Sequence, residues 1–221
     1  SIQVGTGAVG GKMSISAGAA TAEGSKGGIL SLVAGAGVNT DVEDGGDGGD
    51  VLLMGGDSYG LNNSTDIGGS VFISGGDAAS ASGGSVTVIS GMSNGTSSGD
   101  VMMGSAESGP LGTSGAVSLF TGTSSSGTSG HLQLSTGNST SGSGGDISLT
   151  VGDGVGSIGG SVGLTAGPGS AVGGDLNFSA GTGFSKGGHV DMRSGHSYEG
   201  NGGDISLIAS TGQEGGNINV N

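Results

Sequence analysis

The chain has 221 residues, of which 58 are glycine and only 3% are aromatic, and its formal net charge is −14 at pH 7. So few aromatic residues exclude a conventional globular core of large side chains, and two prolines without a three-residue glycine period exclude collagen. The acidic balance makes nucleic acid and anionic membrane surfaces poor partners, cations and cationic surfaces better ones, and the absence of cysteine excludes a disulfide framework.

One pattern recurs along the whole chain, as in "GGDISLT" at 144–150 and "GGDISLI" at 202–208. It consists of two apolar residues separated by one residue, with a small residue two positions after the second. The first apolar positions are Ile2, Met13, Leu30, Val51, Val71, Val86, Val101, Val117, Leu132, Ile147, Val162, Leu176, Val190, Ile205 and Ile218. The second are Val4, Ile15, Leu32, Leu53, Ile73, Val88, Met103, Leu119, Leu134, Leu149, Leu164, Phe178, Met192, Leu207 and Val220. The small residues are Thr6, Ala17, Ala34, Gly55, Gly75, Ser90, Ser105, Thr121, Thr136, Val151, Ala166, Ala180, Ser194 and Ala209.

Alternation of period two over five residues predicts a β-strand with one face turned inward. The glycines before and after each strand permit positive φ angles and tight turns. Because one unit is too small to bury its own apolar face, neighbouring units must stack. The sequence therefore predicts an all-β protein, a parallel β-solenoid of about fifteen 13–21-residue units with one strand per unit and glycine-rich turns. Residues 1–221 form a single array in this interpretation.

Each unit could form a whole coil or half of a two-unit coil. In a two-unit coil, Asp146, Asp175 and Asp204 would stack about 4.8 Å apart as a ladder of like charges. In a one-unit coil, His189 would lie between Asp175 and Asp204, and this order separates the two carboxylates by a histidine. This argument favours one unit per coil, unless a cation bridges the carboxylates.

The segment from Asp41 to Asp50 has the density of carboxylates that a metal site needs. Its acidic residues are Asp41, Glu43, Asp44, Asp47 and Asp50. Residues 45–53 match G-G-x-G-x-D-x-U-x and so resemble a single nonapeptide of the calcium-binding RTX β-roll. The resemblance implies weak Ca²⁺ binding through oxygen ligands. A solvated acidic loop is the favoured alternative, and no other cofactor is expected.

Apolar residues also occupy outward positions in units three to eight. They are Val33, Leu52, Met54, Phe72, Ile89, Met102 and Phe120, named here the outer patch. Later units carry polar residues at these positions. An apolar patch on a solvent face marks an interaction surface. The alternative is that the long loops 36–48 and 57–68 fold over it.

Two further patterns suggest chemistry but lack its context. G-x-S-x-G, typical of a nucleophile elbow, occurs around Ser58, Ser93 and Ser185 without the strand-to-helix setting that it requires. His131, His189 and His196 have no metal-pair spacing. We expect the protein not to be an enzyme.

N-glycosylation sequons begin at Asn62, Asn63, Asn94, Asn138 and Asn177. They favour an extracellular or cell-surface glycoprotein. No polar helix or charged cap covers the first or the last unit, so we expect either further repeats beyond residues 1–221 or subunits stacked end to end.

By composition the chain resembles secreted Gly/Ser-rich β-solenoids among adhesins, algal cell-wall proteins and antifreeze proteins. We therefore expect a structural protein that forms a rod or filament by head-to-tail β-stacking and associates laterally through the outer patch. Its main partner is another copy of itself, with glycans or cationic mineral surfaces as further partners and no insertion into membranes. An ice-binding protein and a surface adhesin or mineral-associated protein are the alternatives.

Overall fold

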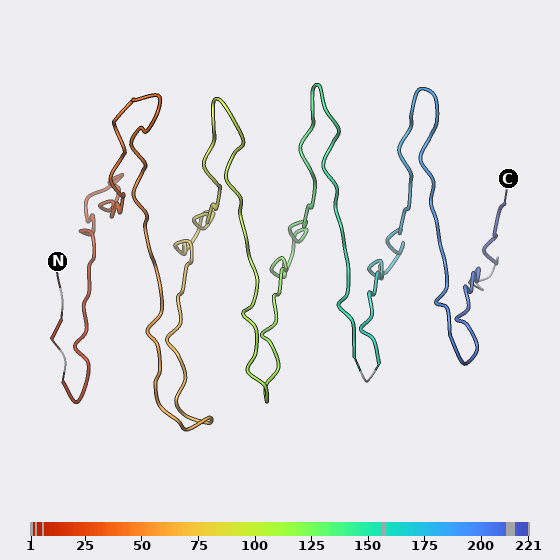
Figure 1. The fold of residues 1–221 in the computed structure, drawn as a ribbon, viewed down its shortest axis with the longest axis horizontal. Coiled ribbons are helices and arrows are strands. Elements are labelled where there is room, and N and C mark those ends of the chain that lie inside the picture. Colours follow the sequence, from red (N-terminus) through yellow and green to blue (C-terminus); the bar gives the residue numbers. More distant parts are fainter. Residues whose placement is uncertain (1, 3, 6, 156–157, 211–214, 221) are drawn as a thin grey trace. The chain divides into compact units, whose positions relative to one another are not determined.

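The computed structural model describes residues 2, 4–5, 7–155, 158–210 and 215–220. These residues contain no α-helix and no β-strand, and Figure 1 shows their trace doubling back at successive loops. The predicted all-β solenoid is therefore wrong. Whether one or two units form a coil is no longer a question, because the described residues form no stacked strands.

The reason for this error is the placement of the backbone hydrogen bonds. A sheet needs bonds between neighbouring extended segments. Among the described residues, the backbone bonds instead join residues of the same loop. The alternating pattern determines which side of a segment is apolar, but it does not determine whether another segment pairs with it.

The chain divides into two compact units, Ser1–Val117 and Ser118–Asn221, and the same local geometry recurs in both. Most bends and turns lie in the loops between apolar segments, for example at 94–96 in the first unit and at 198–200 in the second. No helix long and apolar enough to cross a membrane is found in the part of the chain that the structure describes.

A single hydrogen bond closes nine of these loops, and we call it the loop bridge. In each, a glycine two positions before the next apolar pair donates its N–H to the carbonyl of the residue that opens the loop. The donor–acceptor distances are 2.8–3.0 Å. The bridges are Gly28–Gly18, Gly49–Gly35, Gly69–Gly56, Gly84–Gly76, Gly99–Gly91, Gly174–Gly167, Gly188–Gly181, Gly203–Gly195 and Gly216–Ser210.

The bridging glycines do not supply a left-handed backbone, and an added Cβ would be crowded most at Gly28, Gly69 and Gly84. Only Gly24, with a φ of 68°, is left-handed among the described residues, so the predicted use of positive φ at the paired glycines is wrong. A Cβ added to Gly28 would lie 3.3 Å from the Cβ of Ala17, and one added to Gly188 would lie 3.4 Å from that of Ala180. The small residue of each unit thus packs against a glycine that leaves room for it.

This contact also explains the small residues that follow each apolar pair. Seven of the nine half-buried residues in the described chain belong to this position: Ala34, Gly55, Gly75, Ser90, Ala166, Ala180 and Ala209. Thr6, the small residue of the first unit, lies outside the described residues.

The bridge depends on which small residue is present. All nine bridges form where it is Ala, Gly or Ser. No bridge is found in the loops after Thr121 and Thr136, nor between the described residues of the loop after Val151, and these three side chains are β-branched. The Thr136 hydroxyl donates instead to the Gly145 carbonyl at 3.2 Å. The bridge is also absent after Ser105, where the loop opens with Ala106, although Ser210 opens a bridged loop, so the small residue and the loop-opening residue do not account for this case.

The apolar pairs keep their predicted sidedness but form no core. No side chain in the described residues is buried. Apart from Ile2 and Val220 at the two ends, the paired residues are 40–75% exposed, whereas the outer patch is 78–92% exposed. The inward face predicted from the alternation is therefore the less exposed face, and it remains in contact with solvent.

Exchanging the small residue should remove one bridge and create another. In Ala180→Thr we expect the Gly188 amide to exchange with solvent about fivefold faster, because a backbone hydrogen bond contributes about 1 kcal/mol. In Thr121→Ala we expect the Gly130 amide to exchange about fivefold more slowly for the same reason. Amide exchange measured by NMR at the two glycines tests this, and unchanged rates at both would show that the small residue does not control the bridge.

Candidate functional site

The most extensive candidate site is the set of paired apolar residues, which we call the inner rows. Their spacing follows from the loops: each bridge brings the end of one segment close to the start of the next. Apolar pairs therefore recur beside bridged loops in both units, although no bridge is found between the described residues of the loops after Ser105, Thr121, Thr136 and Val151. Side chains exposed at 40–75% keep most of their apolar surface available for a partner.

The outer patch is exposed on the opposite side of the segments. Its seven residues have exposures between 78% for Leu52 and 92% for Phe72. The loops 36–48 and 57–68 do not cover them, since each of these loops is drawn together by its own bridge, Gly49–Gly35 and Gly69–Gly56. Six of the residues lie in the first compact unit and Phe120 lies in the second.

The acidic loop does not gather its carboxylates. Nowhere in the described part of the chain do three or more acidic or histidine side chains lie close enough to hold a metal ion together. Asp41 uses its carboxylate to accept the Glu43 N–H at 2.9 Å, and its own N–H donates to the Asn39 side chain at 3.1 Å. These bonds shape a local turn. Glu43, Asp44, Asp47 and Asp50 are all exposed.

A serine hydroxyl stabilises a turn in four of the loops. The Ser93 hydroxyl accepts the Thr96 N–H at 2.9 Å, and Ser124, Ser139 and Ser197 each accept the N–H three residues later at 2.8–3.0 Å. All four follow a loop-opening glycine by two positions. Among the three serines of G-x-S-x-G, this explains Ser93 alone. Sequence reasoning set the motif aside because its strand-to-helix setting is missing, but it did not predict the turn, although the constant distance from the loop-opening glycine was visible.

The remaining charged and aromatic groups form small local contacts. The His196 ring lies edge-on to Tyr198 with centroids 5.2 Å apart. Arg193 and Asp191 form an ion pair at 2.8 Å in which both side chains are largely exposed, so it contributes little to stability. His131 and His189 are exposed.

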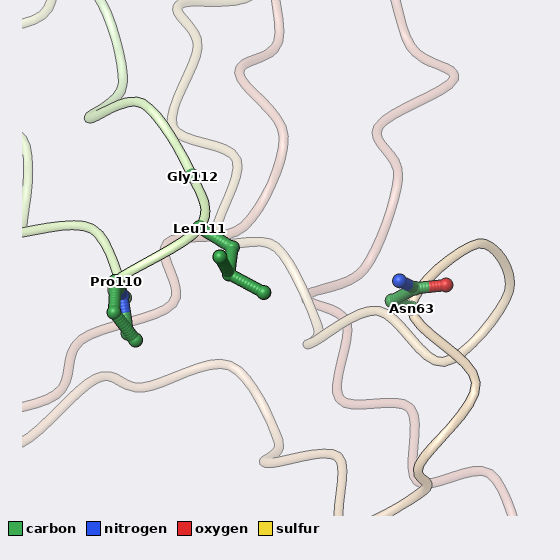
Figure 2. A pocket seen from close by; sticks show the side chains of 5 residues that line it. Asn63, Pro110, Leu111 and Gly112 are labelled. Atoms are coloured by element: carbon green, nitrogen blue, oxygen red, sulfur yellow. The ribbon is translucent and has the colours of Figure 1, made fainter.

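A shallow hollow of about 540 Å³ lies within the first compact unit, and Figure 2 shows the residues that line it. They are Asn63 from one loop and Gly109, Pro110, Leu111 and Gly112 from another. The hollow carries no acidic, basic or histidine side chain, and so has no group for acid–base chemistry.

Comparison with protein-family models, with curated proteins and with solved structures found no match to this chain.

We expect calcium to bind the acidic loop with a dissociation constant on the order of 10⁻⁴ to 10⁻³ M or weaker. The physical reason is that the exposed carboxylates must first be brought together. Calorimetric titration with calcium should show a heat of binding for the unmodified chain and none for the double variant Asp44→Asn with Asp47→Asn. The matched control, Asp77→Asn with Asp100→Asn, removes the same charge elsewhere and should still show the heat of binding. Micromolar affinity would contradict the open arrangement of the loop.

Proposed function

We propose that this chain is an extracellular structural repeat protein that assembles with copies of itself into filaments, with the inner rows as the contact surface. The observation that carries the proposal is the absence of any buried apolar side chain among the described residues. The proposal needs no sheet edge, so it does not depend on the β-stacking predicted from the sequence.

The energetics favour association. Ordering a chain costs on the order of 1–2 kcal/mol per residue in backbone entropy, and burial of apolar surface is the main term that offsets this cost. No apolar side chain in the described part of this chain is buried by its own fold, and the paired residues other than Ile2 and Val220 stay 40–75% exposed. Complete burial of one Val or Leu side chain contributes about 1.5–3 kcal/mol. Burial of many apolar pairs against a partner is therefore the term that could offset both this ordering cost and the roughly 4–15 kcal/mol that association costs.

The repetition of the inner rows favours a second copy as the partner. Later units follow one another at 13–16 residues, and each presents the same kind of apolar pair, in five cases beside a loop closed by a bridge. A surface with this spacing is matched best by another surface with the same spacing. Because the pairs recur along the whole chain, contacts of one kind can engage more than one neighbour, which supports a filament rather than a closed dimer.

The loops support an extracellular location. Asn63 lies within the exposed turn at 63–65, Asn94 within the exposed bend at 94–96, and Asn138 two residues before the bend at 140–142. A sequon in an exposed loop is typical of a secreted protein.

Disrupting the inner rows should weaken association. In Leu134→Ser with Leu149→Ser and Leu164→Ser, we expect the association constant to fall at least about tenfold, which corresponds to about 1.4 kcal/mol. Sedimentation velocity should show assemblies well above the 20.3 kDa chain mass for the unmodified protein and a shift toward that mass for the variant.

The matched control replaces three exposed apolar residues in the loops, Val42→Ser with Leu61→Ser and Val155→Ser. It lowers hydrophobicity similarly and should leave association unchanged. Equal losses in both variants would indicate nonspecific aggregation, and an unmodified chain that stays at 20.3 kDa would refute self-assembly.

Association should also strengthen with salt. The formal charge of −14 makes copies repel one another, and this repulsion extends over about 30 Å at 0.01 M salt but only about 10 Å at 0.1 M. Apolar contacts are not weakened by this screening. We therefore expect larger assemblies as sodium chloride is raised across this range, measured by light scattering. Dissociation on adding salt would point to ionic contacts and would contradict assembly through the inner rows.

A further inference from the structure

The turn at 63–65 contains two overlapping sequons, and the structure distinguishes them. Asn62-Asn63-Ser64 and Asn63-Ser64-Thr65 share two residues. The Asn62 side chain accepts the Ser64 N–H at 3.0 Å, and the Asn62 N–H donates to the Asp66 carboxylate at 2.9 Å. The Asn62 side chain is thus tied to the turn through its Oδ1, although the residue is exposed. None of the hydrogen bonds found in the described residues involves the Asn63 side chain.

Asn63 also lies at the edge of the hollow formed with the loop 109–112. Figure 2 shows the Leu111 side chain extending from its own loop toward the loop that carries Asn63. Leu111 is entirely exposed, and Pro110 adjoins it in the lining. The apolar face of a sugar ring covers such a surface favourably, since it removes apolar area from water. The hollow of about 540 Å³ is large enough for one sugar ring.

We propose that Asn63 is an N-glycosylation site and that the first sugar of its glycan packs in the hollow against Pro110 and Leu111. The donor is a lipid-pyrophosphate-linked oligosaccharide. The Asn63 amide nitrogen forms a bond to C1 of the first sugar while the C1–O bond to the pyrophosphate breaks. The amide loses one proton, and the lipid pyrophosphate leaves. The inference uses the extracellular part of the proposed function but not the self-association.

The full chain, expressed in eukaryotic cells with a cleavable secretion signal, tests the position of the glycan. Enzymatic deglycosylation in heavy-oxygen water converts each modified Asn to labelled Asp, which mass spectrometry locates. We expect label at Asn63 and not at Asn62. Ser64→Ala destroys only the Asn62 sequon and should keep the glycan, whereas Thr65→Ala destroys only the Asn63 sequon and should remove it. An unlabelled Asn63, or a glycan retained at Asn62 in Thr65→Ala, overturns the proposal.

The rate of deglycosylation tests the packing of the sugar. We expect the Asn63 glycan to be released several-fold more slowly from the native chain than from the denatured chain, and Leu111→Ser to remove most of this difference. Equal native and denatured rates in the unmodified chain would refute the contact with the hollow. Sedimentation of Asn63→Gln measures self-association separately, so a failure of one proposal is distinguishable from a failure of the other.

Discussion

The loop bridge is the interaction on which the rest of this structure depends. A glycine N–H donates to the carbonyl of the residue that opens its loop, at 2.8–3.0 Å. The small residue before that carbonyl lies next to the position that a Cβ added to the bridging glycine would take. A side chain on Gly28 or Gly188 would lie within 3.3–3.4 Å of the small residue, and a β-branched residue at the small position accompanies absence of the bridge. In the bridged units one contact therefore links two positions, while the interior of the loop varies in length and composition.

The bridge closes loops, but it contributes little apolar burial. It brings the two ends of a loop together and leaves the adjoining apolar pairs at 40–75% exposure. A net contribution of about 1 kcal/mol per hydrogen bond cannot offset the ordering entropy of a 13–16-residue unit. The local geometry is thus set within each bridged unit. In the proposed self-assembly, the remaining stabilisation would come from surfaces that bury the inner rows, so that the chain would become ordered as it assembles.

Part of this structure could be predicted from the sequence. The period-two alternation correctly identified which side of each segment is less exposed, as Val86 and Val88 show beside Ile89. It could not reveal whether extended segments pair, because an apolar row looks the same whether it faces a neighbouring segment or another chain. The glycines were assigned to positive φ, since sequence alone does not separate conformational freedom from the need for space at Gly188 beside Ala180. The acidic cluster was recognised from its density, but its carboxylates are directed by local turns such as the one at Asp41.

The apolar pairs lie in the segments and most acidic residues lie in the loops, and this separation affects solubility. Most acidic residues, the sequons of the exposed turns and the hydroxyl-capped turns lie in the loops, and the apolar pairs lie between them. The net charge of −14 makes copies repel one another until their apolar pairs are close enough for burial to exceed repulsion. In the proposed assembly, a shift of one chain along another would place polar loops, several of them acidic, against apolar pairs. The proposed function therefore combines a chain that repels its copies over long distances with contacts that depend on register.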